Sequence, residues 1–161
     1  MTIYEAVSIT IAICAIVVAV SQTYLTRKHN RLSVRPSLHF DIMHSKSEFR
    51  ISVKNKGLGP AIIKNFRVLF NGEELVGSIF EIANEISDEL EIAHFAPKVY
   101  MPGEEQSLLP NEELHILRIP DLVSDSEELA RVREALDYLD LQINYLSIYG
   151  ERYSSRGPNV T

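Results

Sequence analysis

Histidine and cysteine are the side chains with which this chain could hold a transition metal. No two histidines lie three or four residues apart in a predicted helix, and the single cysteine, Cys14, lies inside an apolar run. A zinc site needs several such ligands close together, so we expect no metal site and no cofactor. The histidines are then dispersed side chains, exposed or half-buried: His29, His39, His44, His94 and His115.

The sequence also gives little support for acid–base or nucleophilic catalysis. Three acidic pairs, Glu73-Glu74, Glu104-Glu105 and Glu112-Glu113, are adjacent in sequence. Neighbours on a strand or turn point to opposite faces, so they do not share a proton, and we expect them at solvated turn edges. No serine lies in a G-x-S-x-G elbow, and no phosphate-loop lysine follows a glycine-rich turn. We therefore predict a protein that is not an enzyme.

An uncharged run of 21 residues, 6–26, lies between Glu5 and Arg27. As a helix it spans about 30 Å, the thickness of the hydrocarbon layer of a bilayer. It predicts a transmembrane anchor at residues 1–28. A secretory signal peptide is the alternative, but that needs a basic segment before the apolar run, and residues 1–5 carry no basic side chain.

Basic residues follow the apolar run, namely Arg27, Lys28, Arg31 and Arg35. They are expected to set topology and to contact lipid headgroups. The positive-inside rule then places the N-terminus outside and the C-terminal domain in the cytoplasm. A lone cysteine forms no intrachain disulfide, which agrees with the cytoplasm. Residues 29–35 are predicted to form a short basic linker.

Small side chains recur along the predicted helix at Ser8, Ala12, Ala15 and Ala19. Their spacing of four, three and four residues places them on one face, where helices can approach closely. The functional interpretation is a seam for self-association or for a partner helix. The alternative is that alanine is simply common in such helices.

Charge is unevenly distributed over the rest of the chain. The whole chain carries −6. Residues 46–70 contain six basic residues and one acidic residue, whereas residues 71–151 contain 19 acidic and four basic residues. The acidic part would repel nucleic acid and anionic lipid. Arg50, Lys54 and Lys56 could form a face for an anionic partner, or be ordinary solvated charges.

The region 36–155 has the pattern of one mainly β domain. Apolar and polar residues alternate over 37–43, 48–54 and 139–145, and the last of these strands is predicted to run to Tyr149. Further strands are predicted at 61–70, 98–101, 113–119 and 152–155. Residues 78–91 and a segment capped by Asp125 predict helices. Tyr145 and Tyr149 are expected on one strand face, and 156–161 as a flexible tail. The pattern favours an antiparallel immunoglobulin-like sandwich or small barrel with one or two short helices.

Two stretches carry a resemblance. The run Asn55-Lys56-Gly57-Leu58-Gly59-Pro60-Ala61 resembles the N-x-G-x-G-x-A turn of bacterial immunoglobulin-like domains, and Tyr145-Leu146-Ser147-Ile148-Tyr149-Gly150 resembles their late Y-x-S-x-Y-G hairpin. The layout is similar to small bacterial proteins with one membrane helix and a cytoplasmic β domain. The resemblance implies a membrane effector in an anti-phage defence module.

Two functions follow as hypotheses. In the first, the β domain binds a protein partner, a signal or a second copy, and the helix acts at the inner membrane. In the second, the protein is a passive tether that recruits a soluble enzyme or a nucleic-acid complex through the basic 46–67 face. A membrane-bound hydrolase is a third hypothesis, which no motif supports.

Overall fold

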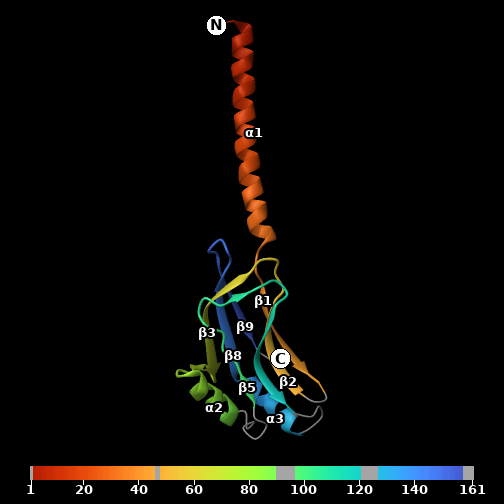
Figure 1. The fold of residues 1–161 in the computed structure, drawn as a ribbon, viewed down its shortest axis with the longest axis vertical. Coiled ribbons are helices and arrows are strands. Elements are labelled where there is room, and N and C mark those ends of the chain that lie inside the picture. Colours follow the sequence, from red (N-terminus) through yellow and green to blue (C-terminus); the bar gives the residue numbers. More distant parts are fainter. Residues whose placement is uncertain (1, 46–47, 90–96, 121–126, 158–161) are drawn as a thin grey trace. The chain divides into compact units, whose positions relative to one another are not determined.

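The computed structural model describes residues 2–45, 48–89, 97–120 and 127–157 (Figure 1). The chain divides into two compact units, Met1–Val34 and Arg35–Thr161. The first consists of helix α1, and the second is a β domain. The predicted outline is therefore confirmed: an apolar N-terminal helix precedes a mainly antiparallel β domain that also contains short helices.

Helix α1 (Ile3–Ser33) begins at a capping box. The Thr2 hydroxyl accepts a hydrogen bond from the Glu5 N–H at 3.4 Å, and the Thr2 N–H donates to the Glu5 carboxylate at 2.9 Å. These bonds satisfy N–H groups that a helix start leaves unpaired. Among the described helices, α1 is the one long and apolar enough to cross a membrane.

The linker predicted at residues 29–35 is not a separate segment. α1 continues beyond residue 28, and its last helical bond runs from the Val34 N–H to the Asn30 carbonyl at 3.3 Å. No glycine or proline interrupts the chain before Pro36, and the residues there tolerate a helix. Pro36 disfavours helical geometry at the residue before it, so the helix ends where the first breaker appears.

The β domain is built from short strands. In chain order they are β1 (Leu38–His44), β2 (Glu48–Asn55), β3 (Ala61–Phe70), β4 (Glu73–Glu74), β5 (Lys98–Val99), β6 (Ser107–Leu108), β7 (Glu113–Pro120), β8 (Leu139–Leu146) and β9 (Arg152–Gly157). Helices α2 (Ile79–Glu89) and α3 (Glu127–Leu136) interrupt them. Both predicted helices are thus confirmed, although the proposed cap Asp125 lies outside the described residues.

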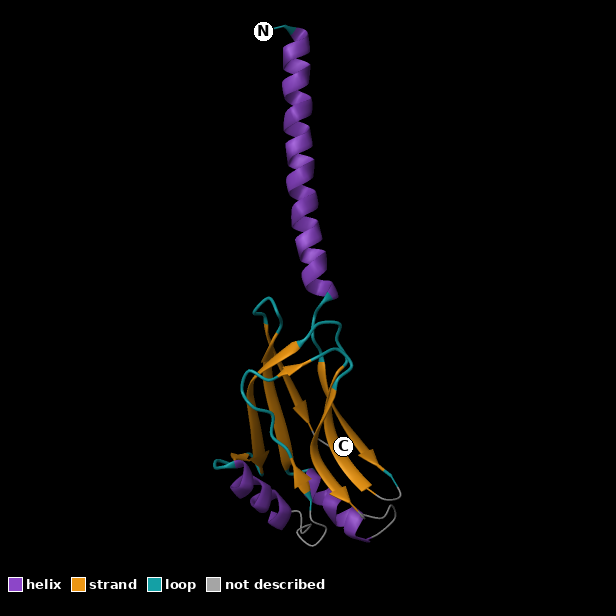
Figure 2. Ribbon diagram, in the orientation of Figure 1, coloured by secondary structure: helices purple, strands orange, loops and turns teal. Residues whose placement is uncertain are grey.

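Within the described residues the strands form two antiparallel sheets (Figure 2). The first has the order β1-β2-β7-β5, and the second has the order β4-β3-β8-β9 with β6 paired to β3. The chain crosses from the first sheet to the second between β2 and β3. On one side the sheets approach where β1 meets β9, because a Cβ added to Gly157 would lie 2.6 Å from the Phe40 Cβ.

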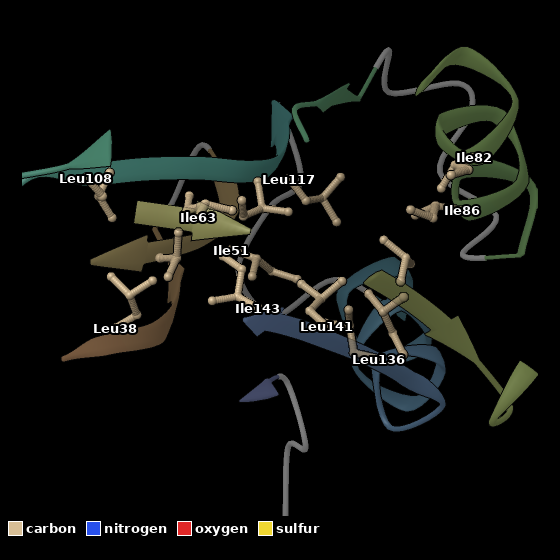
Figure 3. Close-up of a cluster of buried hydrophobic side chains, with 14 of the residues drawn as sticks. Leu38, Ile51, Ile63, Ile82, Ile86, Leu108, Leu117, Leu136, Leu141 and Ile143 are labelled. Carbon is tan, nitrogen blue, oxygen red and sulfur yellow. The ribbon is translucent and has the colours of Figure 1, made fainter. Parts of the chain in front are cut away.

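Alternation along the strands explains the core. In β8, Leu139, Leu141 and Ile143 are buried, while Asp140 and Gln142 between them are half-buried. Side chains from both sheets meet in one cluster, which α2 and α3 extend (Figure 3). The helices contribute Ile82, Ile86, Val132 and Leu136.

The prediction that the last long strand reaches Tyr149 is wrong. β8 ends at Leu146, because the Ser147 hydroxyl accepts hydrogen bonds from the N–H groups of Tyr149 (3.2 Å) and Glu151 (3.3 Å). Such side-chain bonds offer the backbone an alternative to the ladder. Tyr149 is exposed in the turn, so it does not share a strand face with the buried Tyr145. β9 includes residues 156 and 157 of the predicted tail, and the remainder of the tail lies outside the described residues.

Candidate functional site

Asn55 holds together the end of the β domain that contains the domain's first residues. The side chain is fully buried. Its oxygen accepts hydrogen bonds from the N–H groups of Ser37 (3.1 Å) and Gly57 (3.0 Å). Its amide donates to the carbonyls of Gly59 (2.8 Å) and Leu108 (3.0 Å). All four hydrogen bonds of the carboxamide are thus used within the fold. The turn is therefore structural, and no Asn55 group is left for a ligand.

Gly57 allows the turn to pack directly against the start of the domain. A Cβ at this position would lie 2.4 Å from the Arg35 carbonyl oxygen and 2.5 Å from the Ser37 nitrogen. Two backbone bonds join the same segments: the Lys56 N–H donates to the Ser37 carbonyl at 2.8 Å, and the Leu58 N–H donates to the Arg35 carbonyl at 3.2 Å. The β domain is therefore fixed from Arg35 onward, two residues after α1 ends.

A pair of tyrosines lies beside Arg35. Tyr145 and Tyr153 stack with their ring centroids 5.6 Å apart, and the Arg35 guanidinium lies 4.8 Å from the centre of the Tyr153 ring. The Tyr145 hydroxyl accepts a hydrogen bond from the Leu38 N–H at 3.2 Å. Burial raises the pKa of Tyr153, and its hydrogen bond to Glu151 acts in the same direction. Arg35, predicted to contact headgroups, here holds a cation–π contact within the domain.

The remaining predicted membrane residues lie along α1. Ser8, Ala12, Ala15 and Ala19 are exposed on the helix. The Thr23 hydroxyl donates to the Ala19 carbonyl at 2.9 Å, within the helix. Arg27, Lys28 and Arg31 are exposed in the last turns of α1.

The predicted anionic-partner residues lie on or beside the outer face of the first sheet. Arg50 and Lys54 alternate with buried side chains of β2, and Lys56 follows in the turn. Carboxylates accompany two of them. Arg50 is 3.6 Å from Glu48 and 3.7 Å from Glu113, and Lys56 is 2.8 Å from Asp41. Intramolecular pairs thus offset much of the positive charge of this face.

The three acidic pairs behave as separated carboxylates. At least one member of each pair makes a contact of its own, since Glu74 binds Arg67, Glu105 binds Lys64, and Glu112 accepts a hydrogen bond from the Leu109 N–H at 2.7 Å. Glu113 accepts one from the Ser52 hydroxyl at 2.6 Å. They stabilise turns and strand edges. Across residues 2–45, 48–89, 97–120 and 127–157, no group of three metal-ligating side chains is arranged to hold an ion.

Two of the hollows in the described part of the β domain bear on ligand binding. An apolar space of about 10 Å³ between the sheets, lined in part by Ile51, Val68 and Ile86, has room for about one water. An open depression of about 450 Å³ lies over β3, β8 and β9 and is lined by Lys64, Asn144, Tyr145, Leu146, Arg152 and Tyr153. The inner space is too small for a ligand.

A family model described as "Domain of unknown function (DUF8453)" matches residues 2–157, which covers α1 and the β domain together. The chain belongs to this family. No curated protein matches it. Because the match runs through α1 as well as the sheets, helix and β domain form one family unit.

Proposed function

We propose that this DUF8453 protein is a non-enzymatic membrane protein whose β domain binds a protein partner or a second copy while α1 acts in the bilayer. The supporting observation is the pairing of α1, which is long and apolar enough to span, with a β domain fixed from Arg35 onward. Such a short connection passes a displacement of the domain to the helix with little slack. A protein whose helix served only as an anchor would tolerate a flexible linker between α1 and the β domain.

We propose a single pass through the bacterial inner membrane, with the N-terminus outside and the β domain in the cytoplasm. Arg27, Lys28 and Arg31 are exposed at the C-terminal end of α1, and Glu5 lies near the other end. This asymmetry follows the positive-inside rule. The basic side chains then lie at headgroup level, where anionic lipid attracts them.

We propose further that the β domain is an immunoglobulin-like sandwich. In that fold the strands of one sheet follow the order A-B-E-D and those of the other include C, F and G. The order β1-β2-β7-β5 corresponds to the first, and β3-β8-β9 corresponds to the second, with β4 beside β3 as an additional edge strand. Domains of this kind bind partners through their sheets and loops, and the fold alone names no ligand.

In this proposal, the packing of α1 helices along the seam produces the effect on the membrane. Binding that gathers several copies raises the local concentration of their helices, and the face formed by Ser8, Ala12, Ala15 and Ala19 allows close packing. The resemblance to bacterial defence effectors suggests that packed helices perturb the membrane.

The test follows membrane potential and growth in cells that express the full chain. Replacing Ala12, Ala15 and Ala19 with leucine fills the seam and is expected to reduce depolarisation. The matched control replaces Ile13, Val17 and Val20, which lie off the seam face, with leucine, and is expected to behave as the unmodified chain. Equal depolarisation by both variants would remove the seam from the mechanism. A C-terminal reporter active only in the periplasm would overturn the orientation.

The alternative is a passive tether that recruits an anionic partner. One observation favours it: Arg50 pairs with Arg118, and Arg118 pairs with Lys98, so three cations cross the first sheet in a row. Against it, Glu48 binds both arginines of this row, Arg118 at 2.7 Å and Arg50 at 3.6 Å. The row is therefore partly neutralised within the protein.

A further inference from the structure

Large apolar side chains are exposed in three turns of the β domain. Leu58 is 73% exposed in the turn after β2, and Leu109 is 58% exposed before β7. Ile148 and Tyr149, at the tip between β8 and β9, are 51% and 45% exposed. Each protrudes from a turn whose backbone is already hydrogen-bonded, so the exposed side chain does not hold its own turn together.

The three turns lie at one end of the domain, which we call the Arg35 end (Figure 1). The Asn55 N–H donates to the Glu112 carbonyl at 3.0 Å and the Asn111 N–H donates to the Asn55 carbonyl at 2.8 Å, which joins the first two turns. The third belongs to the same end because Leu146 pairs with Ile62 at the start of β3 and with Arg152 at the start of β9. Leu58 itself is bonded to Arg35 through its N–H.

Chain length fixes how far this end can be from a bilayer that α1 spans. With residues 6–26 in the hydrocarbon, the seven residues 27–33 add about 10 Å of helix. Each headgroup layer is about 5–8 Å thick. Only Val34 lies between the last helical residue, Ser33, and the bonded Arg35. The Arg35 end is therefore held at the outer edge of the headgroups.

We infer that the Arg35 end rests on the headgroup region of the bilayer, with Leu58, Leu109, Ile148 and Tyr149 as its lipid contacts. The inference rests on the proposed function, because it requires α1 to span. Interfacial sites favour amphipathic tyrosine and exposed aliphatic side chains. Glu112 and Glu151 lie in the same turns and accept local hydrogen bonds. Lys56 and Arg152 lie beside them, so these turns carry both signs of charge, and the contact that we infer is the apolar one, which does not need anionic lipid.

The chain contains no tryptophan, so single tryptophans report on it without background. The full chain is reconstituted in phosphatidylcholine vesicles carrying a spin label at the headgroup or at mid-chain. Test variants are Leu58→Trp, Leu109→Trp and Tyr149→Trp. Matched controls are Val76→Trp and Phe80→Trp, whose side chains are 86% and 79% exposed beyond β4, at the opposite end of β3. Val18→Trp reports on α1 itself. Circular dichroism verifies that each variant is folded.

The expected result is a shift of emission to shorter wavelength at the three test positions and a loss of intensity with the headgroup label, with neither at positions 76 and 80. Test positions that behave like the controls, while the mid-chain label quenches position 18, would overturn this inference and leave the proposed function standing. No quenching at position 18 would overturn both. Quenching at the test positions that requires added phosphatidylglycerol would show attraction by charge and overturn the apolar contact.

Discussion

The side-chain oxygen of Asn55 accepts a hydrogen bond from the Ser37 N–H, 18 residues earlier in the chain, at 3.1 Å. This bond joins the end of β2 to the segment that follows α1. It is one of four that Asn55 makes, two accepted and two donated. The position therefore holds the first residues of the β domain in place, close to where α1 ends.

Asn55→Asp should destabilise the β domain strongly although it preserves size. The carboxylate keeps both acceptors but loses the two donors, which leaves the Gly59 and Leu108 carbonyls facing a buried negative charge. We expect a loss of about 2–4 kcal/mol in the free energy of unfolding, measured by denaturant titration of the full chain in detergent. Asn144→Asp, at an exposed position of β8, is the control and should cost less than about 0.5 kcal/mol. Equal losses in both variants would contradict the assignment.

Gly57→Ala tests the close approach of the turn to Arg35. The added methyl group meets backbone atoms, which cannot rotate away as a side chain can. We expect the variant to lose about 1–3 kcal/mol of unfolding free energy, as overpacked sites do. Gly103→Ala is the matched control, because a Cβ there meets nothing within 4 Å. Thermal unfolding of the two variants gives the comparison. A Gly57→Ala protein as stable as Gly103→Ala would contradict the close backbone approach at Gly57.

Local patterns predicted the elements of this chain better than their ends. Pro60 before the strand and Asn71-Gly72 after it predict β3 with its observed bounds, and Asn71-Gly72 forms the expected turn, with φ of 53° and 83°. The end of β8 depends on a hydroxyl that competes with the ladder, which alternation does not report. α1 extends past residue 28 because charge marks the edge of a membrane without ending a helix.

The candidate site was less accessible to sequence reasoning. The N-x-G-x-G pattern indicated a structural turn, but not that Asn55 would bond Ser37 and Leu108, which are distant in sequence. The sequence shows that the segment 46–67 is basic. It does not show that Asp41 and Glu113, which come from other strands, are partners of these basic residues. Strand register decides which charges meet, and one sequence does not fix register.

The start of α2 should respond to acid. The Glu81 carboxylate accepts a 2.6 Å hydrogen bond from the Ser78 N–H, and the bonds with Ser78 hold the pKa of Glu81 below its usual value. A lowered pKa stabilises the fold above the unfolded value of about 4.3, and that stabilisation is lost as pH falls through the folded pKa. The free energies of unfolding of the wild type and of Glu81→Gln should therefore differ near neutral pH and become equal at acidic pH. Glu85→Gln removes an exposed carboxylate from mid-helix and should give no such convergence; a pH-independent difference for Glu81→Gln would contradict the prediction.

Reversing Arg50, Lys54 and Lys56 to glutamate should leave membrane localisation and depolarisation unchanged. Glu48 and Glu113 already accompany Arg50, and Asp41 accompanies Lys56, so two of the three cations are offset within the protein and the face presents little free positive charge to an anionic partner. Exposed ion pairs contribute about 0–1 kcal/mol each, so Lys56 adds little to stability. Retention on heparin at increasing salt measures the charge that the face presents. We expect weak retention of the native chain. Tight, salt-sensitive retention that the triple variant loses would favour the tether over a helix that acts in the bilayer.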